Sequence, residues 1–186
     1  MPVLLQINEC LNYSTGKIAQ QIGELAIGKG WESWIAYSGL EKAIPSKSNI
    51  IKVGSPLNAI IHYAKFRLFD KEGLVSRKET KYLIEKIDAI KPTIIHLHNI
   101  HDHWLNYELL FEYIAQKRIP VVWTQHDCWS FTGGCMYYDM LNCDKWKKKC
   151  IKCHDRRTLI NRASINLRKK ISSISRIDKI VFVPFE

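Results

Sequence analysis

Short apolar runs alternate along the chain with segments in which apolar residues recur at helical spacing. The runs are typical of buried strands, and they occupy residues 3–7, 34–37, 50–53, 93–97, 120–124 and 179–183. Helical periodicity is found at residues 18–26, in two pieces between 57 and 90 that separate near Gly73, at 105–114 and at 160–174. This alternation predicts an α/β protein, a Rossmann-like doubly wound parallel sheet with helices on both faces.

In a doubly wound sheet, ligands bind beyond the carboxyl ends of the strands. This rule selects four loops, at residues 10–17, 38–46, 98–103 and from 125 onward. Residues 1–186 are expected to form one domain, with an irregular Cys-rich insertion at 125–156.

The chain of 186 residues carries a net charge of +10, and this charge is concentrated in one segment. Between residues 144 and 176 there are twelve Lys or Arg and only two Asp or Glu, a surplus equal to that of the whole chain. Such a segment attracts phosphates, anionic lipid or nucleic acid. The alternative is a solvated helix face without a partner.

Nothing in the chain indicates a membrane span or a leader. No apolar run approaches the roughly 18 to 20 residues that cross a bilayer. The first residues lack a charged segment, and Gln6, Asn8 and Glu9 come too early for a signal peptide. We therefore expect a cytoplasmic protein with reduced or metal-bound cysteines.

The first of the four loops contains Ser14, Thr15, Gly16 and Lys17 at the start of a predicted helix. Backbone N–H groups at a helix N-terminus favour anions, and a glycine allows close approach of a ligand. These four residues are candidates for binding an anionic ligand, such as a phosphate. Alternatively, Ser14 or Thr15 simply caps the helix.

Histidines follow two of the predicted strands. His98, Asn99 and His101 are candidates for contacts with a sugar hydroxyl or a phosphate, since the spacing of the histidines matches no standard zinc site. After the next strand, His126 is a candidate acid, base or hydrogen-bond donor. Asp127 either orients His126 or caps the following segment.

Five of the six cysteines lie in the insertion. Cys150 and Cys153 have the spacing of a zinc knuckle, and a closed tetrahedral site is expected to use four thiolates: Cys135, Cys143, Cys150 and Cys153. His154 and Cys128 are substitute ligands. The insertion has little apolar area to bury, which favours a metal as its constraint. The alternative is a set of reduced, partly buried thiols.

Residues 96–101 and 120–135 resemble family 4 glycosyltransferases, in particular the bacterial subset that serves exopolysaccharide, colanic-acid-type or O-antigen synthesis. The spacing of Cys143, Lys145, Trp146, Cys150 and Cys153 is also similar to that subset, and residues 12–19 resemble its first loop and helix.

The resemblance implies a GT-B fold, in which two Rossmann-like domains face each other across a cleft. This chain would be the N-terminal, acceptor-side half of a retaining enzyme that needs no catalytic metal. Gly16 would lie near the phosphates of a nucleotide-sugar donor, and His126 near the reacting sugar carbon. No donor-binding domain follows residue 186, so we expect the chain alone to be inactive.

The expected partners are a saccharide or lipid-linked acceptor, a donor-binding domain in cis or in trans, and the anionic inner membrane surface through residues 145–176. Two other functions stay open. One is a zinc-containing basic module that binds nucleic acid, which the neutral remainder of the chain disfavours. The other is a non-catalytic protein that docks on a separate donor domain.

Overall fold

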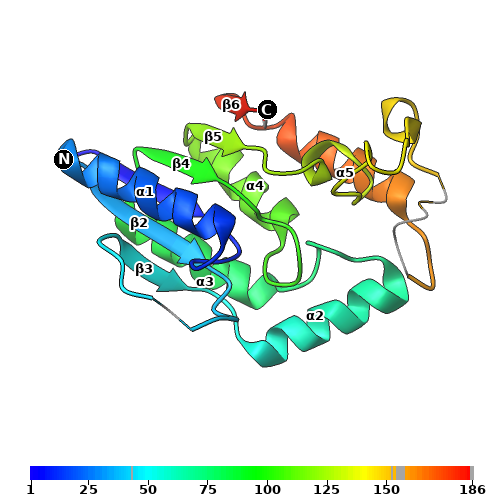
Figure 1. Cartoon of the computed structure of the whole chain (residues 1–186), viewed down its shortest axis with the longest axis horizontal. Coiled ribbons are helices and arrows are strands. Elements are labelled where there is room, and N and C mark those ends of the chain that lie inside the picture. The colour runs from blue at the N-terminus through cyan, green and yellow to red at the C-terminus, as the bar shows by residue number, and fades with distance from the viewer. Residues whose placement is uncertain (43, 152, 154–157, 185–186) are drawn as a thin grey trace.

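The computed structural model describes residues 1–42, 44–151, 153 and 158–184, and a six-stranded sheet forms its centre (Figure 1). The strands are β1 (Val3–Ile7), β2 (Glu32–Tyr37), β3 (Asn49–Lys52), β4 (Ile94–Leu97), β5 (Val121–Thr124) and β6 (Ile180–Val183). Their spatial order is β3-β2-β1-β4-β5-β6, and each neighbouring pair is parallel.

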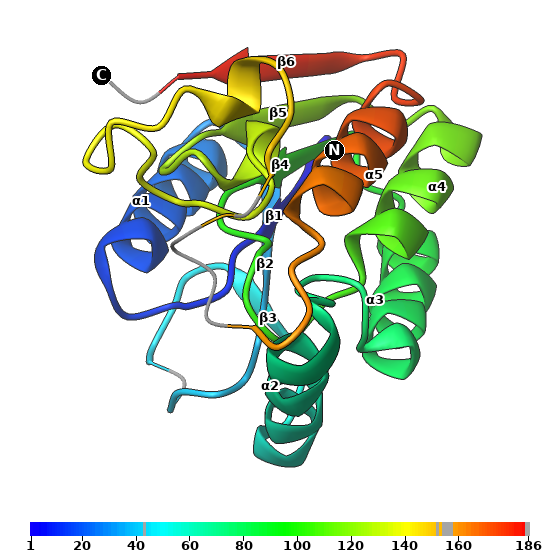
Figure 2. The same ribbon diagram turned by 90° about the vertical axis from the view of Figure 1, so that its right-hand side faces the viewer.

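Helices cover both faces of this sheet. They are α1 (Ser14–Gly28), α2 (Pro56–Phe69), α3 (Arg77–Ile90), α4 (Tyr107–Lys117) and α5 (Ala163–Ile174), with short 3₁₀ turns η1 (Trp129–Phe131) and η2 (Lys145–Lys147). Figure 2 shows α1 on one face and the row α3, α4, α5 on the other. The predicted doubly wound parallel sheet is confirmed.

The two faces of the sheet differ in chemistry because side chains alternate along each strand. On the face covered by α3 and α4, Leu5 and Ile7 belong to the large apolar core. On the α1 face the same strand presents Gln6, which is fully buried and donates from Nε2 to the Ala19 carbonyl oxygen of α1 at 2.7 Å. A buried polar group therefore lies directly beneath the site described below.

The strand β6 is the outer strand on its side of the sheet, and it pairs with β5. Val181, Phe182 and Val183 are exposed, although the Phe182 ring stacks on that of Trp123. No helix among the described residues is both long and apolar enough to cross a membrane.

Candidate functional site

The strand order reverses between β1 and β4, and the candidate site lies at the carboxyl ends of these strands and of β5. Asn8, just after β1, joins two of the loops that the sequence selected. Its Nδ2 donates to Thr15 Oγ1 at 3.1 Å, and its Oδ1 accepts the backbone N–H of Asn99 at 3.1 Å. The buried Asn8 thus holds the start of α1 beside the histidine loop.

The capping role considered for Ser14 and Thr15 is not observed. The N-cap residue of α1 is Tyr13, and no side chain caps the helix there. Gly16 is required by its own chain, because a Cβ at this position would lie 2.3 Å from the carbonyl carbon of Leu11. Its presence is therefore explained by packing, whether or not a donor phosphate approaches it.

The rings of His98 and His126 are in contact at the carboxyl ends of β4 and β5. His98 Nδ1 lies 2.9 Å from His126 Nε2, and the two rings are nearly parallel with centroids 5.2 Å apart. His98 Nε2 lies 3.2 Å from Gln6 Oε1. His98 is buried with both nitrogens engaged, so it supports His126 and does not face a ligand, whereas His126 is half-buried.

His96 stacks on His98 from behind, with ring centroids 4.2 Å apart. Its Nε2 lies 2.8 Å from Thr124 Oγ1 of β5. His96 is therefore a half-buried histidine of the sheet whose Nε2 has a hydrogen-bonding partner.

Asp127 does not orient His126. Its Oδ1 accepts the backbone N–H of Trp129, the first residue of η1, at 2.8 Å, and its Oδ2 lies 2.7 Å from His101 Nε2. His101 Nδ1 makes a second ion pair with Asp102 Oδ2 at 3.1 Å, without the alignment of a hydrogen bond. The N-cap residue of η1 is Cys128, so Asp127 contacts the first residue of the following segment from the position before its N-cap.

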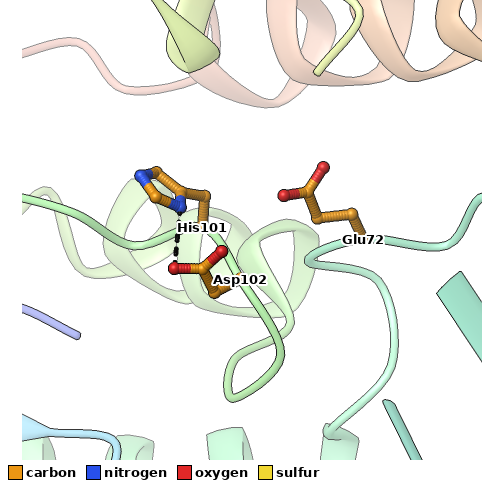
Figure 3. Close-up of side chains that lie close together, drawn as sticks. All are labelled: Glu72, His101 and Asp102. Atoms are coloured by element: carbon orange, nitrogen blue, oxygen red, sulfur yellow. Dashed lines mark ion pairs between the residues drawn. The ribbon is translucent and has the colours of Figure 1, made fainter. Parts of the chain in front are cut away.

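His101 is nearly fully buried, and both of its ring nitrogens face carboxylates. The saccharide contact expected for His101 would require one of these ion pairs to break. Figure 3 shows the Glu72 carboxylate, from the connection between α2 and α3, facing His101 and Asp102. The three residues offer ligand atoms within 4.8 Å of one another, which is the arrangement of a cation site. A protonated His101 supplies one positive charge to this cluster.

The electrostatics separate His101 from the other two histidines. Burial lowers the pKa of His98 to about 2, assisted by His96 and His126, so this ring is neutral. Burial also lowers the pKa of His126, against the charge of Asp127. Burial would lower the pKa of His101 too, but Asp102 and Asp127 outweigh it and raise that pKa to about 10.

An open pocket of about 330 Å³ adjoins His126. Its walls come from the end of β5 and from the insertion, including Asp127, Met136, Tyr137 and Tyr138. The pocket is large enough for a sugar ring and contains the one histidine of the pair that is partly exposed. Pockets of similar or larger volume elsewhere on the molecule, such as that near Arg77 and Arg168, lack this chemistry.

The four candidate zinc ligands do not converge. Cys135 and Cys150 are buried and Cys143 and Cys153 half-buried, all as free thiols. No three cysteine sulfurs of the described residues lie within 4.8 Å of one another, whereas a zinc tetrathiolate requires separations of about 3.8 Å. Cys150 accepts the Gly133 N–H at 3.2 Å and packs on Ala163. The substitute ligand His154 lies outside the described residues.

A cluster of aromatic rings constrains the insertion independently of any metal. Phe131, Tyr138 and Trp146 pack mutually, with ring centroids 5.0 to 6.0 Å apart. Gly133 rests on α5, since a Cβ there would lie 2.6 Å from the Ala163 carbonyl oxygen. The expectation that the insertion has too little apolar area to hold itself overlooked these rings.

Sequence reasoning also missed Gln6, Asn8, Glu72 and Asp102. The first two were used only as evidence against a signal peptide, although polar residues in an apolar strand were the available signal. Glu72 comes from a connection far away in the chain, and no local pattern marks it.

Comparison with known proteins agrees with this architecture. Residues 20–183 match the family model of Glycosyltransferase Family 4. WcaC of Escherichia coli strain K12, named as a colanic acid biosynthesis glycosyl transferase, is 27% identical over 146 residues, which cover 73% of this chain and 35% of WcaC. The chain thus spans about a third of this curated relative.

The fold is also found in UGT2 of Phytolacca americana. The apo structure has a TM-score of 0.51 at 8% identity, and the match covers all of this chain and 46% of UGT2. A second structure, UGT2 complexed with UDP-2fluoro-glucose and pterostilbene, gives the same TM-score and identity with 48% coverage. The parallel sheet with its flanking helices is thus the Rossmann-like fold of a GT-B half, and the chain belongs to Glycosyltransferase Family 4.

Proposed function

We propose that this chain is the acceptor-side domain of a retaining glycosyltransferase that transfers a sugar from a nucleotide-sugar donor to a lipid-linked or polysaccharide acceptor. The observation that carries the proposal is the half-buried His126 beside an open pocket at the switch point of the sheet. The name of WcaC supports a saccharide acceptor, and the UDP-sugar bound to UGT2 supports a nucleotide-sugar donor.

Within this proposal, the acceptor hydroxyl binds beside His126, and the first turn of α1 faces the donor phosphates. Lys17 is exposed and follows Gly16 in that turn. A helix N-terminus and a nearby lysine both stabilise phosphate charge. The donor-binding domain is contributed by further polypeptide, in cis or in trans, so the 186 residues alone do not catalyse transfer. No catalytic metal takes part.

The decisive experiment joins this chain to the carboxyl-terminal two thirds of WcaC and supplies UDP-glucose, UDP-galactose or GDP-mannose with bacterial lipid-linked saccharides. We expect release of nucleoside diphosphate from the fusion and not from the isolated chain. His126→Ala should lower the rate about 100-fold, because the acceptor hydroxyl loses the contact that positions it. Release by the isolated chain, or undiminished release by His126→Ala, contradicts the proposal.

We also propose that the insertion contacts an anionic membrane surface. Exposed apolar and basic side chains follow one another along this segment: Tyr137, Met140, Leu141, Lys145, Lys147, Lys148, Lys149 and Ile151. The α5 part of the basic segment contributes less, because Lys169 pairs with Glu108 and Lys170 is buried, donating to the Trp129 carbonyl oxygen. These internal partners also speak against the nucleic-acid alternative.

Sedimentation with vesicles tests the membrane contact. The chain should bind phosphatidylglycerol vesicles and not phosphatidylcholine vesicles. Changing Lys147, Lys148 and Lys149 to Gln should weaken binding by about 1 kcal/mol for each lysine. Leu25→Glu, at an exposed position on α1, is the matched control and should leave binding unchanged. Equal weakening by both variants would place the contact elsewhere.

We separately propose a structural zinc that would draw the four candidate thiols of the insertion together, since they lie farther apart in this structure than in a closed zinc site. Its support is the Cys150–Cys153 spacing and the proximity of the Cys143 and Cys153 thiols to Cys150, which contribute to raising the pKa of Cys150 after burial itself. Metal analysis of the purified chain should find one zinc for each polypeptide, lost in Cys150→Ser. A metal-free chain with unchanged stability favours the alternative of reduced thiols.

A further inference from the structure

The amide of Gln6 has only one chemically consistent orientation. Its Nε2 lies 2.7 Å from the Ala19 carbonyl oxygen, which can only accept a hydrogen bond. The reverse orientation would place two oxygens at that distance. The acceptor Oε1 therefore faces His98 Nε2 at 3.2 Å. Because Gln6 is fully buried, no water can replace this contact at low cost.

This orientation determines where the protons lie on two imidazole rings. His98 must carry its proton on Nε2, since that nitrogen faces an acceptor. A neutral ring has one N–H, so His98 Nδ1 presents a lone pair to His126 Nε2, 2.9 Å away. His126 must then donate from Nε2, and its own Nδ1 is left with a lone pair. With both rings neutral, any other distribution places two N–H groups or two lone pairs opposite each other.

The surroundings of His126 leave this arrangement undisturbed. The nearest carboxylate in sequence, Asp127, directs its oxygens to His101 and to the Trp129 N–H. His126 Nδ1 has no hydrogen-bond partner among residues 1–42, 44–151, 153 and 158–184, and the residue lines the pocket of about 330 Å³. His126 is therefore backed by a neutral chain of Gln6 and His98, in contrast to the carboxylate-backed histidine of a His–Asp pair.

We infer that Gln6 and His98 are positioning residues that hold His126 as the Nε2–H tautomer, so that its Nδ1 accepts a hydrogen bond from a hydroxyl group of the bound saccharide. The proton stays on that hydroxyl group, and no group is transferred to the ring. The role of the hydroxyl rests on the proposed function, whereas the tautomer is a property of this chain alone.

Nuclear magnetic resonance of the ¹⁵N-histidine-labelled chain tests the tautomer directly. We expect a slowly exchanging proton bonded to His126 Nε2, with a coupling through the hydrogen bond to His98 Nδ1. His126→Asn assigns the signals by removing them. A proton bonded to His98 Nδ1, or a His126 Nδ1–H, overturns the inference. The wild-type spectrum suffices, so a variant that fails to fold does not remove the test.

The role of Gln6 is tested with Gln6→Met, which keeps the length of the side chain and removes the acceptor. We expect the coupling to be lost and His126 to populate both tautomers. The matched control is Thr124→Val, which removes the partner of His96 in the same ring stack but leaves the Gln6 chain intact. An unchanged spectrum for Gln6→Met, or equal changes in both variants, would contradict the role of Gln6.

The transfer assay separates this inference from the proposed function. In the fusion with the WcaC segment, Gln6→Met should lower the rate about tenfold and Thr124→Val should leave it unchanged. A tautomer as inferred in a chain whose fusion transfers no sugar would retain the positioning role and refute the proposed function. Active transfer with full rate in Gln6→Met would refute the positioning role instead.

Discussion

The carboxyl end of the sheet and the Cys-rich insertion are both rich in polar and reactive side chains, but they are ordered by different means. At the carboxyl end, partners come from neighbouring parallel strands, as in the contact between Gln6 of β1 and His98 after β4. In the insertion, order comes from three aromatic rings and the contact of Gly133 with α5. The comparison teaches that strand register fixes geometry accurately, whereas a loop needs its own small core.

The largest effect on stability is expected at the ion pairs of His101, at the carboxyl end of the sheet. His101→Ala leaves Asp102 and Asp127 without their cation in a buried site, which should lower the free energy of unfolding by about 3–5 kcal/mol. Urea denaturation at pH 7 measures this. His126→Ala is the matched control and should cost much less, because that residue is half-buried and not ion-paired. A loss below about 1 kcal/mol for His101→Ala would show that the two ion pairs of His101 contribute little to stability.

The same ion pairs predict that the stability of the fold falls as the pH rises. The folded pKa of His101, about 10, lies above its ordinary value of 6.5, so the folded state binds the proton more tightly. Its contribution is complete below pH 6.5 and is lost as the pH rises toward 10. Thermal unfolding between pH 6.5 and 9 should show a fall that is absent in His101→Gln. A flat wild-type profile would contradict the raised pKa.

In the insertion, a smaller and local effect is expected. Trp146→Ala removes the ring that contacts both Phe131 and Tyr138, so residues 132–151 should open without global unfolding. Limited trypsin digestion should cleave at Lys147 to Lys149 at least tenfold faster, while the melting temperature changes by only a few degrees. Tyr137→Ala, which removes an exposed ring outside the cluster, should leave cleavage unchanged. A global loss of stability would show that insertion and sheet unfold together.

The smallest effect is a gain in stability from replacing Glu9, which lies just beyond the carboxyl end of β1. Burial, and then the charge of Asp102, raise the pKa of Glu9 from 4.5 to about 7. Its raised folded pKa means that stability present below pH 4.5 is lost as the pH rises toward 7. Glu9→Gln should remove this loss and add about 1–2 kcal/mol at pH 8, with little change at pH 4. Chemical denaturation at both pH values measures it, and a destabilised variant at pH 8 would refute the raised pKa.

The sequence was sufficient for the order of elements and for the loops that converge, because periodicity and the carboxyl-end rule depend on local pattern and chain direction. It was sufficient to place His98 and His126 near each other. It did not reveal that Asp127 pairs with His101, since that depends on side-chain direction after the strand. Glu72 and the ring cluster around Trp146 depend on tertiary contacts that no spacing encodes.

The outer position of β6 has a consequence for handling the protein. An outer strand with exposed Val181, Phe182 and Val183 offers backbone hydrogen-bonding groups and apolar side chains to any extended peptide. At high protein concentration, as in overexpression or before crystallisation, copies of the chain would aggregate by pairing their β6 strands. Val181→Lys would place a charge on this outer strand and reduce such aggregation, and the exposed position keeps the lysine out of the core.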